Sequence, residues 1–292
     1  MVSISALKIK SYAIRVAFAE FLGTCILLVI GLGSIVQSVT SHTAYGTFTS
    51  TNWAWGMAVM FKLTVTLLLG GHINPAISLA MAVIGRLQWK LLPVYMLAQY
   101  LGAFVGTAIV YLVYFEAIEN YSGGVKLTDP TLANSTAGIF STYPQEFLSV
   151  TEGLADQIVG TMMLLLPIMA ITDRRNADVP KFLVPVLVGL AVFAIGAAYG
   201  YNCGAAINPA RDLSPRIFTA LAGWGTEVFS FRNYNWFWVP IVGPHIGAIL
   251  GAIIYLFLVE LHWDSEDELS NDFPPGDSGE IKAEDSGDTT FL

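Results

Sequence analysis

The sequence predicts an all-α membrane protein with six transmembrane helices and two re-entrant half-helices, arranged as an inverted 3+3 repeat. Three observations lead to this prediction. The 292 residues are 54% hydrophobic and only 12% charged, about half the charged fraction of a soluble domain. The apolar residues form long runs, each near the ~20 residues that cross a bilayer. The tripeptide Asn-Pro-Ala occurs twice, as Asn74-Pro75-Ala76 and Asn208-Pro209-Ala210.

Six apolar segments are long enough to cross the hydrocarbon core as helices. The predicted spans are residues 16–38, 52–69, 91–116, 151–172, 182–201 and 238–261. Two further apolar segments, 75–84 and 209–219, have about half that length and cannot cross alone. Each begins at Asn-Pro, a helix start in which Asn caps the helix and Pro takes the first helical position. We therefore expect two half-helices that enter the membrane and turn back.

The chain also contains an internal repeat. Ala-Glu-Phe-Leu-Gly-Thr at 19–24 is echoed by Asp-Gln-Ile-Val-Gly-Thr at 156–161, and each is followed by its own Asn-Pro-Ala box. Repeat one covers about 16–116 and repeat two about 151–262, joined by the connection 117–150. Because each repeat has an odd number of spans, the second has the opposite orientation, and the half-helices meet near the bilayer midplane.

Basic residues predict which side of the membrane each connection occupies. They gather on one side, at Lys8, Lys10, Arg15, Arg86, Lys90, Arg174, Arg175 and Lys181. The N-terminus (1–15) and the C-terminal segment (263–292) are therefore expected in the cytoplasm, and the connection 117–150 outside, most simply in the plasma membrane. Asn120 and Asn134 in this connection each begin a tripeptide that can accept an N-linked glycan.

The C-terminal segment 263–292 is strongly acidic. Residues 264–292 contain ten carboxylates and one lysine, a net charge of −9. Such a composition predicts a disordered, solvated tail.

The two half-helix starts predict a polar path at the midplane. Helix N-termini carry positive potential, and the Asn74 and Asn208 amides can donate hydrogen bonds to a passing hydroxyl or water. The loops before the boxes are expected to line this path with backbone carbonyls, since irregular backbone at membrane depth is tolerated beside a cavity. The expected carbonyls are those of Gly70, Gly71, His72, Cys203 and Gly204. This combination suits neutral hydrogen-bonding solutes and repels cations.

Charged residues inside the apolar segments indicate function, because burying them in a membrane is costly. Arg211 lies three residues after Asn208, and Asp212 next to it offsets part of the cost. Glu20, with Gln157 in repeat two, is expected to accept hydrogen bonds from N–H groups of a nearby loop. A pH-sensing pair of Glu20 with His72 is the alternative.

These motifs resemble the aquaporin family, in particular the aquaglyceroporin branch and its vertebrate nine- and ten-type members. The resemblance covers about residues 10–262. Glycerol-conducting members are similar in Asp212 after the second box, in Arg216, and in the pair Pro240-Ile241 of the last span. The resemblance implies the aquaporin fold and a homotetramer in the lipid bilayer with one pore per subunit. It implies passive conduction of glycerol and water, with urea as a further candidate. No cofactor, metal, catalytic residue or nucleic-acid partner is expected.

The resemblance also places an outer constriction at Gly196, Ala205 and Arg211. Many glycerol channels carry a large aromatic residue where Ala205 stands, so a wide constriction is implied. The fourth position is either Ala54 or Trp55, because repeat one is one residue short in this region.

The segment 61–69 departs from the family pattern. It contains Lys62 and three consecutive Leu residues where the family carries small residues. One interpretation is a local bulge with an intact pore. The other is an obstructed pore in a non-conducting membrane protein that acts in assembly or adhesion. A channel mainly for water is a third alternative, against which Asp212 and Pro240-Ile241 argue. No nucleophile–base set is evident, so no enzyme activity is expected.

Overall fold

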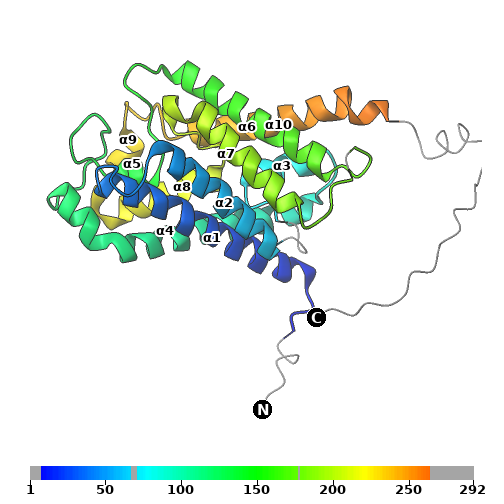
Figure 1. Ribbon diagram of the computed structural model, residues 1–292, viewed down its shortest axis with the longest axis horizontal. Coiled ribbons are helices and arrows are strands. Elements are labelled where there is room, and N and C mark those ends of the chain that lie inside the picture. Colours follow the sequence, from blue (N-terminus) through cyan, green and yellow to red (C-terminus); the bar gives the residue numbers. More distant parts are fainter. Residues whose placement is uncertain (1–7, 67–70, 177, 264–292) are drawn as a thin grey trace, which may run out of the picture.

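The computed structural model describes residues 8–66, 71–176 and 178–263, and its long helices run along the longest axis of the molecule (Figure 1). The helices are α1 (Tyr12–Thr40), α2 (Phe48–Thr66), α3 (Pro75–Val83), α4 (Leu92–Ser122), α5 (Ala137–Phe140), α6 (Val150–Thr172), α7 (Val184–Cys203), α8 (Pro209–Thr219), α9 (Glu227–Ser230) and α10 (Val239–Leu258). Short helical turns, η2 (Trp89–Leu91), η3 (Ala220–Trp224) and η4 (Glu260–His262), adjoin them. Over the described ranges the chain forms helices and no strand.

Five of the predicted spans are helices that are long and apolar enough to cross a membrane: α1, α4, α6, α7 and α10. The sixth is α2, which has 19 residues and a length of about 28 Å, close to the thickness of the hydrocarbon core. It is less apolar than the others because it contains several Thr residues together with Asn52 and Lys62. The end of the predicted span, 67–69, lies outside the described residues. The all-helical, multi-pass membrane architecture is confirmed.

The half-helices are α3 and α8, of 9 and 11 residues. At 1.5 Å per residue they are about 14 and 17 Å long, half the depth of the membrane core. The capping predicted from sequence forms at both starts. The Asn74 side chain accepts from the Ala76 N–H at 2.9 Å, and the Asn208 side chain from the Ala210 N–H at 3.0 Å.

The helix contacts have the two-fold pattern expected of an inverted repeat. Helix α1 packs along α4 as α6 packs along α10, while α2 and α7 pack on each other between the repeats. Each half-helix lies against the last long helix of the other repeat, α3 on α10 and α8 on α4. The two repeats therefore interlock through their half-helices.

The bundle has two ends, the loop face and the tail face. The loop face carries the connections 41–47, 123–149 and 220–238. The tail face carries the connections 84–91 and 173–183, the N-terminal end of α1 and the C-terminal end of α10 (Figure 1). The long connection begins later than predicted because α4 continues to Ser122. Asn120 therefore lies in the last turn of α4, whereas Asn134 lies in the loop with a φ of 63°.

Glycines allow the paired long helices to touch backbone to backbone. A Cβ on Gly102 of α4 would lie 2.2 Å from the carbonyl oxygen of Phe21, and one on Gly247 of α10 would lie 2.2 Å from that of Ile158. Small residues at such crossings are the main way in which helices approach closely in membranes.

Replacing Gly102 by Leu is therefore expected to force α1 and α4 apart. Overpacking against rigid backbone costs about 1–3 kcal/mol at an ordinary core site, and this site has no flexible side chain that could yield. The matched control is Gly33→Leu on α1, where an added Cβ meets nothing within 4 Å. The unfolding temperature in detergent should fall for Gly102→Leu and change little for Gly33→Leu. Equal unfolding temperatures would contradict the close crossing.

Candidate functional site: a cavity through the bundle

A cavity of about 1190 Å³ extends between the two faces of the bundle. Its wall includes Phe48 and Tyr201 toward the loop face, Asn74 and Asn208 midway, and Lys181 toward the tail face. The described part of the unusual segment also contributes to the wall, through Lys62 and Leu63. Residues 67–70, and with them the predicted Gly70 carbonyl, lie outside the described residues.

The two Asn side chains join the loops of the opposite repeats. The Asn74 amide nitrogen donates to the Ile207 carbonyl at 2.9 Å, and the Asn208 amide nitrogen donates to the Ile73 carbonyl at 2.9 Å. A side-chain amide has two N–H groups, so each Asn keeps one further donor beside the cavity. The half-helix starts are thus fixed in position and still able to bind a solute.

The loops that lead into the boxes hold strained backbone. Gly71 and Ile73 in repeat one, and Ala205 and Ile207 in repeat two, have φ values between 43° and 58°. Positive φ is rare for a β-branched residue and costs about 1–3 kcal/mol. Within the described chain, no donor reaches the carbonyl oxygens of Gly71, His72, Gly204 and Ala205, and all four residues line the cavity. These carbonyls are available as acceptors along the path.

Glu20 holds the first of these loops. Its carboxylate is fully buried and accepts from the backbone N–H groups of His72 at 2.8 Å and Ile73 at 2.6 Å. The Gln99 amide donates to it at 2.8 Å. Glu20 therefore contacts His72 through the backbone, while the His72 ring lies 3.2 Å from the Ser78 hydroxyl.

Gln157 has the corresponding contact in the second repeat, where its carbonyl oxygen accepts from the Ile207 N–H at 3.1 Å. Its amide nitrogen lies 3.2 Å from the Cys203 sulfur. The predicted role of the Cys203 carbonyl along the path stays a prediction. Cys203 ends α7 with its thiol turned toward Asp156 and Gln157, and it is absent from the cavity wall.

Trp55 and Arg211 stack on each other in the cavity wall near the loop face. The Arg211 guanidinium carbon lies 4.7 Å from the Trp55 ring centre, and Arg211 donates to the Phe140 carbonyl at 2.8 Å. Of the two residues considered for the fourth constriction position, Trp55 lines the cavity and Ala54 does not. Gly196 and Ala205 complete this part of the wall.

Asn52 is a wall residue that the sequence did not indicate. Its side-chain oxygen would lie 2.2 Å from a Cβ placed on Gly196, so the Asn52 amide occupies the space that the glycine leaves. It also donates to the Phe48 carbonyl, one turn earlier, at 3.0 Å.

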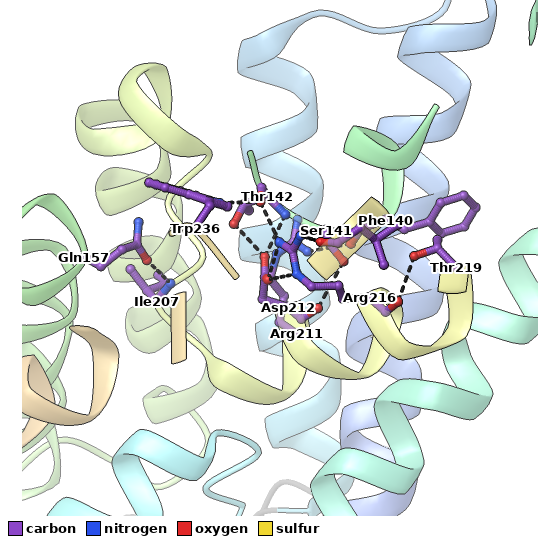
Figure 2. A network of polar contacts seen from close by, with 11 residues as sticks. Phe140, Ser141, Thr142, Gln157, Ile207, Arg211, Asp212, Arg216, Thr219 and Trp236 are labelled. Atoms are coloured by element: carbon purple, nitrogen blue, oxygen red, sulfur yellow. Dashed lines mark hydrogen bonds and ion pairs between the residues drawn. The ribbon is translucent and has the colours of Figure 1, made fainter. Parts of the chain in front are cut away.

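A buried ion pair lies behind the constriction (Figure 2). Asp212 and Arg216 are both fully buried and pair at 2.8 Å, one turn apart on α8. The other carboxylate oxygen of Asp212 accepts from the backbone N–H of Thr142 at 2.6 Å and from its hydroxyl. The Ser141 hydroxyl donates to the Asp212 carbonyl at 3.0 Å. Asp212 thus binds the loop whose Phe140 carbonyl holds Arg211.

Arg216 ties the same loop from the other side. It donates to the Thr142 carbonyl at 2.7 Å and to the Val228 carbonyl at 2.9 Å. The Trp236 indole N–H also donates to the Thr142 carbonyl, at 2.9 Å (Figure 2). The pair Pro240-Ile241 lies in the first turn of α10 and is not part of the cavity wall.

The sequence predicted the site residues but not the residues that hydrogen-bond to them. Phe140, Thr142 and Gln99 bind Arg211, Asp212 and Glu20 across 71, 70 and 79 positions of the chain. Thr142 belongs to a connection that the sequence marks only as a loop.

A helical inverted repeat that surrounds a cavity between its two faces defines a membrane channel rather than an enzyme. Residues 7–255 match the sequence profile of the major intrinsic protein family, and the chain belongs to this family. Aquaporin-9 of Homo sapiens is 46% identical over 264 residues, which cover 90% of this chain and 88% of the relative. Aquaporin-10 of Homo sapiens is 45% identical over 272 residues, which cover 91% and 88%.

Two further similar proteins support the same family assignment. Aquaporin-10 of Milnesium tardigradum is 50% identical over 270 residues, which cover 88% of this chain. The chain spans 65% of the length of that relative. The X-ray structure of the aquaglyceroporin from Plasmodium falciparum superposes with a TM-score of 0.76 at 32% identity, covering 86% of this chain and all of that one.

Proposed function

We propose that the chain is a passive channel for glycerol and water, with urea as a further solute. The observation that supports this most strongly is the part of the cavity wall formed by Trp55 and Arg211. There an apolar ring and guanidinium donors lie in contact with each other, and Ala205 in the same wall adds only a methyl group. A polyol has an apolar carbon edge that can lie against the ring and a hydroxyl edge that can accept from the guanidinium.

The midplane suits the same solutes. The Asn74 and Asn208 amides can donate hydrogen bonds to a solute, and the loop carbonyls can accept them. A solute hydroxyl therefore exchanges its hydrogen bonds with water for hydrogen bonds with the protein. Arg211 and two opposed helix N-termini place positive potential on the path, which repels protons and metal cations. The names of the similar proteins, which include an aquaglyceroporin, support this proposal.

The alternative of an obstructed, non-conducting protein is less well supported. Lys62 and Leu63 line the same cavity as residues near both faces of the bundle, which favours a continuous path. A channel mainly for water is disfavoured by the small side chain at Ala205.

We further propose that the tail face is cytoplasmic, because the basic residues gather on it, and that the plasma membrane holds the protein as a homotetramer. Lipid and neighbouring subunits would then cover the exposed apolar side chains on the outside of the bundle, such as Leu97, Leu112 and Phe257. Asn134, exposed on the loop face, is the better placed of the two glycan acceptors.

Narrowing the constriction tests the proposed solute. Ala205→Phe should lower glycerol flux at least tenfold in proteoliposomes, while water flux falls less, because a water molecule needs less width. Light scattering after a glycerol or sucrose shock measures the two rates. The matched control is Ala44→Phe in the exposed 41–47 connection, which should leave both unchanged. Equal loss of both fluxes in Ala205→Phe would argue against a constriction that selects by size.

A further inference from the structure

Lys126 lies in a cage of aromatic rings near the start of the 123–149 connection. Three ring centres lie 5.7, 5.7 and 5.0 Å from its ammonium nitrogen, those of Tyr111, Phe115 and Trp224. Glu119 forms an ion pair with the same ammonium. An ammonium within about 6 Å of an aromatic ring centre is attracted to the face of the ring. The Lys126 side chain is only 15% exposed, so water screens these attractions weakly.

Helix α4 provides most of the cage. Tyr111, Phe115 and Glu119 are spaced four residues apart, so they lie in one row along α4. Gly123 ends the helix in the left-handed conformation, which allows the chain to turn back toward this row. Trp224, at the end of η3, adds the third ring from the second repeat. The cage therefore joins the two halves of the chain at the loop face.

The backbone next to the caged lysine is joined to α5. The Leu127 carbonyl accepts from the N–H groups of Thr136 and Ala137, both at 3.2 Å. Ala137 begins α5, which ends at Phe140. The Phe140 carbonyl accepts from the Arg211 guanidinium at 2.8 Å. A short chain of backbone contacts thus leads from the cage to the guanidinium in the cavity wall.

The rings of the cage also contact this segment directly. The Phe140 ring centre lies 6.1 Å from that of Tyr111 and 5.6 Å from that of Trp224. The Trp224 indole N–H donates to the Thr136 hydroxyl at 3.2 Å. The backbone route and the ring route therefore both end at Phe140, whose side chain is fully buried.

We propose that Lys126 is a positioning residue for Arg211. The caged ammonium fixes the segment 127–140, so the Phe140 carbonyl keeps the guanidinium against the Trp55 ring. The consequence for flux rests on the proposed function, a glycerol channel. Without the charge of Lys126 the segment gains freedom, and the guanidinium spends less time where a glycerol hydroxyl can accept from it. Glycerol is then slowed more than water.

Hydrogen exchange tests the positioning without any flux measurement, so its result stands whether or not the chain conducts glycerol. Lys126→Met keeps an unbranched side chain and removes the charge. In the full chain in detergent, the amides of Thr136 and Ala137 should exchange at least fivefold faster in this variant. Lys126→Arg should restore slow exchange, because a guanidinium also stacks on aromatic rings. Equal exchange in the wild type and in Lys126→Met would overturn the proposal.

The matched control is Lys90→Met, which removes an exposed lysine charge on the tail face. Its exchange at Thr136 and Ala137 should equal that of the wild type. Faster exchange in this control would mean that loss of any lysine charge loosens the segment, and it would also overturn the proposal.

A flux measurement in proteoliposomes tests the consequence. The ratio of glycerol to water permeability should fall about threefold in Lys126→Met and keep the wild-type value in Lys126→Arg and Lys90→Met. A merely structural role would reduce the amount of folded protein and lower both permeabilities together, so an unchanged ratio in Lys126→Met would overturn the proposal. A wild-type protein that does not conduct glycerol would contradict the proposed function, and the exchange rates would still decide the role of Lys126.

A double-mutant cycle tests whether the lysine acts through the cage. Phe115 is partly exposed, with 45% of its surface accessible, so Phe115→Leu removes one ring at little cost to the core. Residues that act as one unit have non-additive effects. The double variant should therefore have nearly the same permeability ratio as Lys126→Met alone. A ratio equal to the product of the two single effects would show that Lys126 does not act through the cage, which would overturn the proposal.

Discussion

Replacing Asp212 by Asn should destabilise the protein more than any other conservative change in the bundle. The substitution keeps the size of the side chain but leaves the fully buried Arg216 guanidinium without its counter-ion. Removing one partner of a buried pair costs about 3–5 kcal/mol. The amide has one accepting oxygen, so either Thr142 or Arg216 would meet an N–H₂ group where a carboxylate oxygen now accepts. We expect a lower unfolding temperature in detergent and a lower yield of folded protein.

The matched control is Glu260→Gln. It breaks a pair with Arg86 of similar length, but both side chains are partly exposed, and such pairs contribute about 0–1 kcal/mol. Glycerol flux of Asp212→Asn, measured per folded protein, should fall as well, because the loop that holds Arg211 through the Phe140 carbonyl loses its anchor. Equal unfolding temperatures for the two variants would show that the buried pair does not fix this loop.

Replacing Glu20 by Leu is expected to have the second largest effect. The backbone N–H groups of His72 and Ile73 lose their acceptor inside the bundle. Each buried donor left unpaired costs about 1–3 kcal/mol, and the Gln99 amide also loses a partner. The loop before the first Asn-Pro-Ala box would then move, and with it the Ile73 carbonyl that holds Asn208. Glycerol flux should fall strongly along with stability.

Glu20→Gln is the control, because repeat two uses Gln157 at the corresponding place and satisfies the Ile207 N–H with one oxygen. This variant keeps one acceptor and should retain most of the stability. Hydrogen exchange at His72 and Ile73, together with flux at several pH values, separates the interpretations. A strong pH dependence that disappears in Glu20→Gln would favour a sensing role over a structural one.

The sequence predicted the helices that are determined by local sequence features. Apolar run length, the Asn-Pro caps and the repeat lead to α1, α3, α6 and α8 within a few residues of the observed bounds. The sequence predicted the end of this span at residue 116, whereas α4 continues to Ser122. The last turns of α4 are polar and resemble a loop in the sequence, although they form helix. The choice between Ala54 and Trp55 depended on a register that only the packed bundle determines.

The central residues of the candidate site were predictable from the sequence. The groups that hold those residues in place were not. Asn74, Asn208 and Arg211 belong to motifs with a physical meaning of their own. Their partners, the carbonyls of Ile73, Ile207 and Phe140, are backbone groups without a sequence signal. Long-range contacts of this kind follow from the interlocking of the repeats, since each loop is held from the opposite half of the chain.

The most direct test of the central claim is the glycerol permeability of the wild-type protein. Purified protein in liposomes of neutral lipid would be mixed with glycerol, and light scattering would follow the recovery of vesicle volume. The account predicts entry much faster than in empty vesicles, independent of an ion gradient and slowed by Ala205→Phe. Entry no faster than in empty vesicles, with the folded oligomer intact, would contradict it.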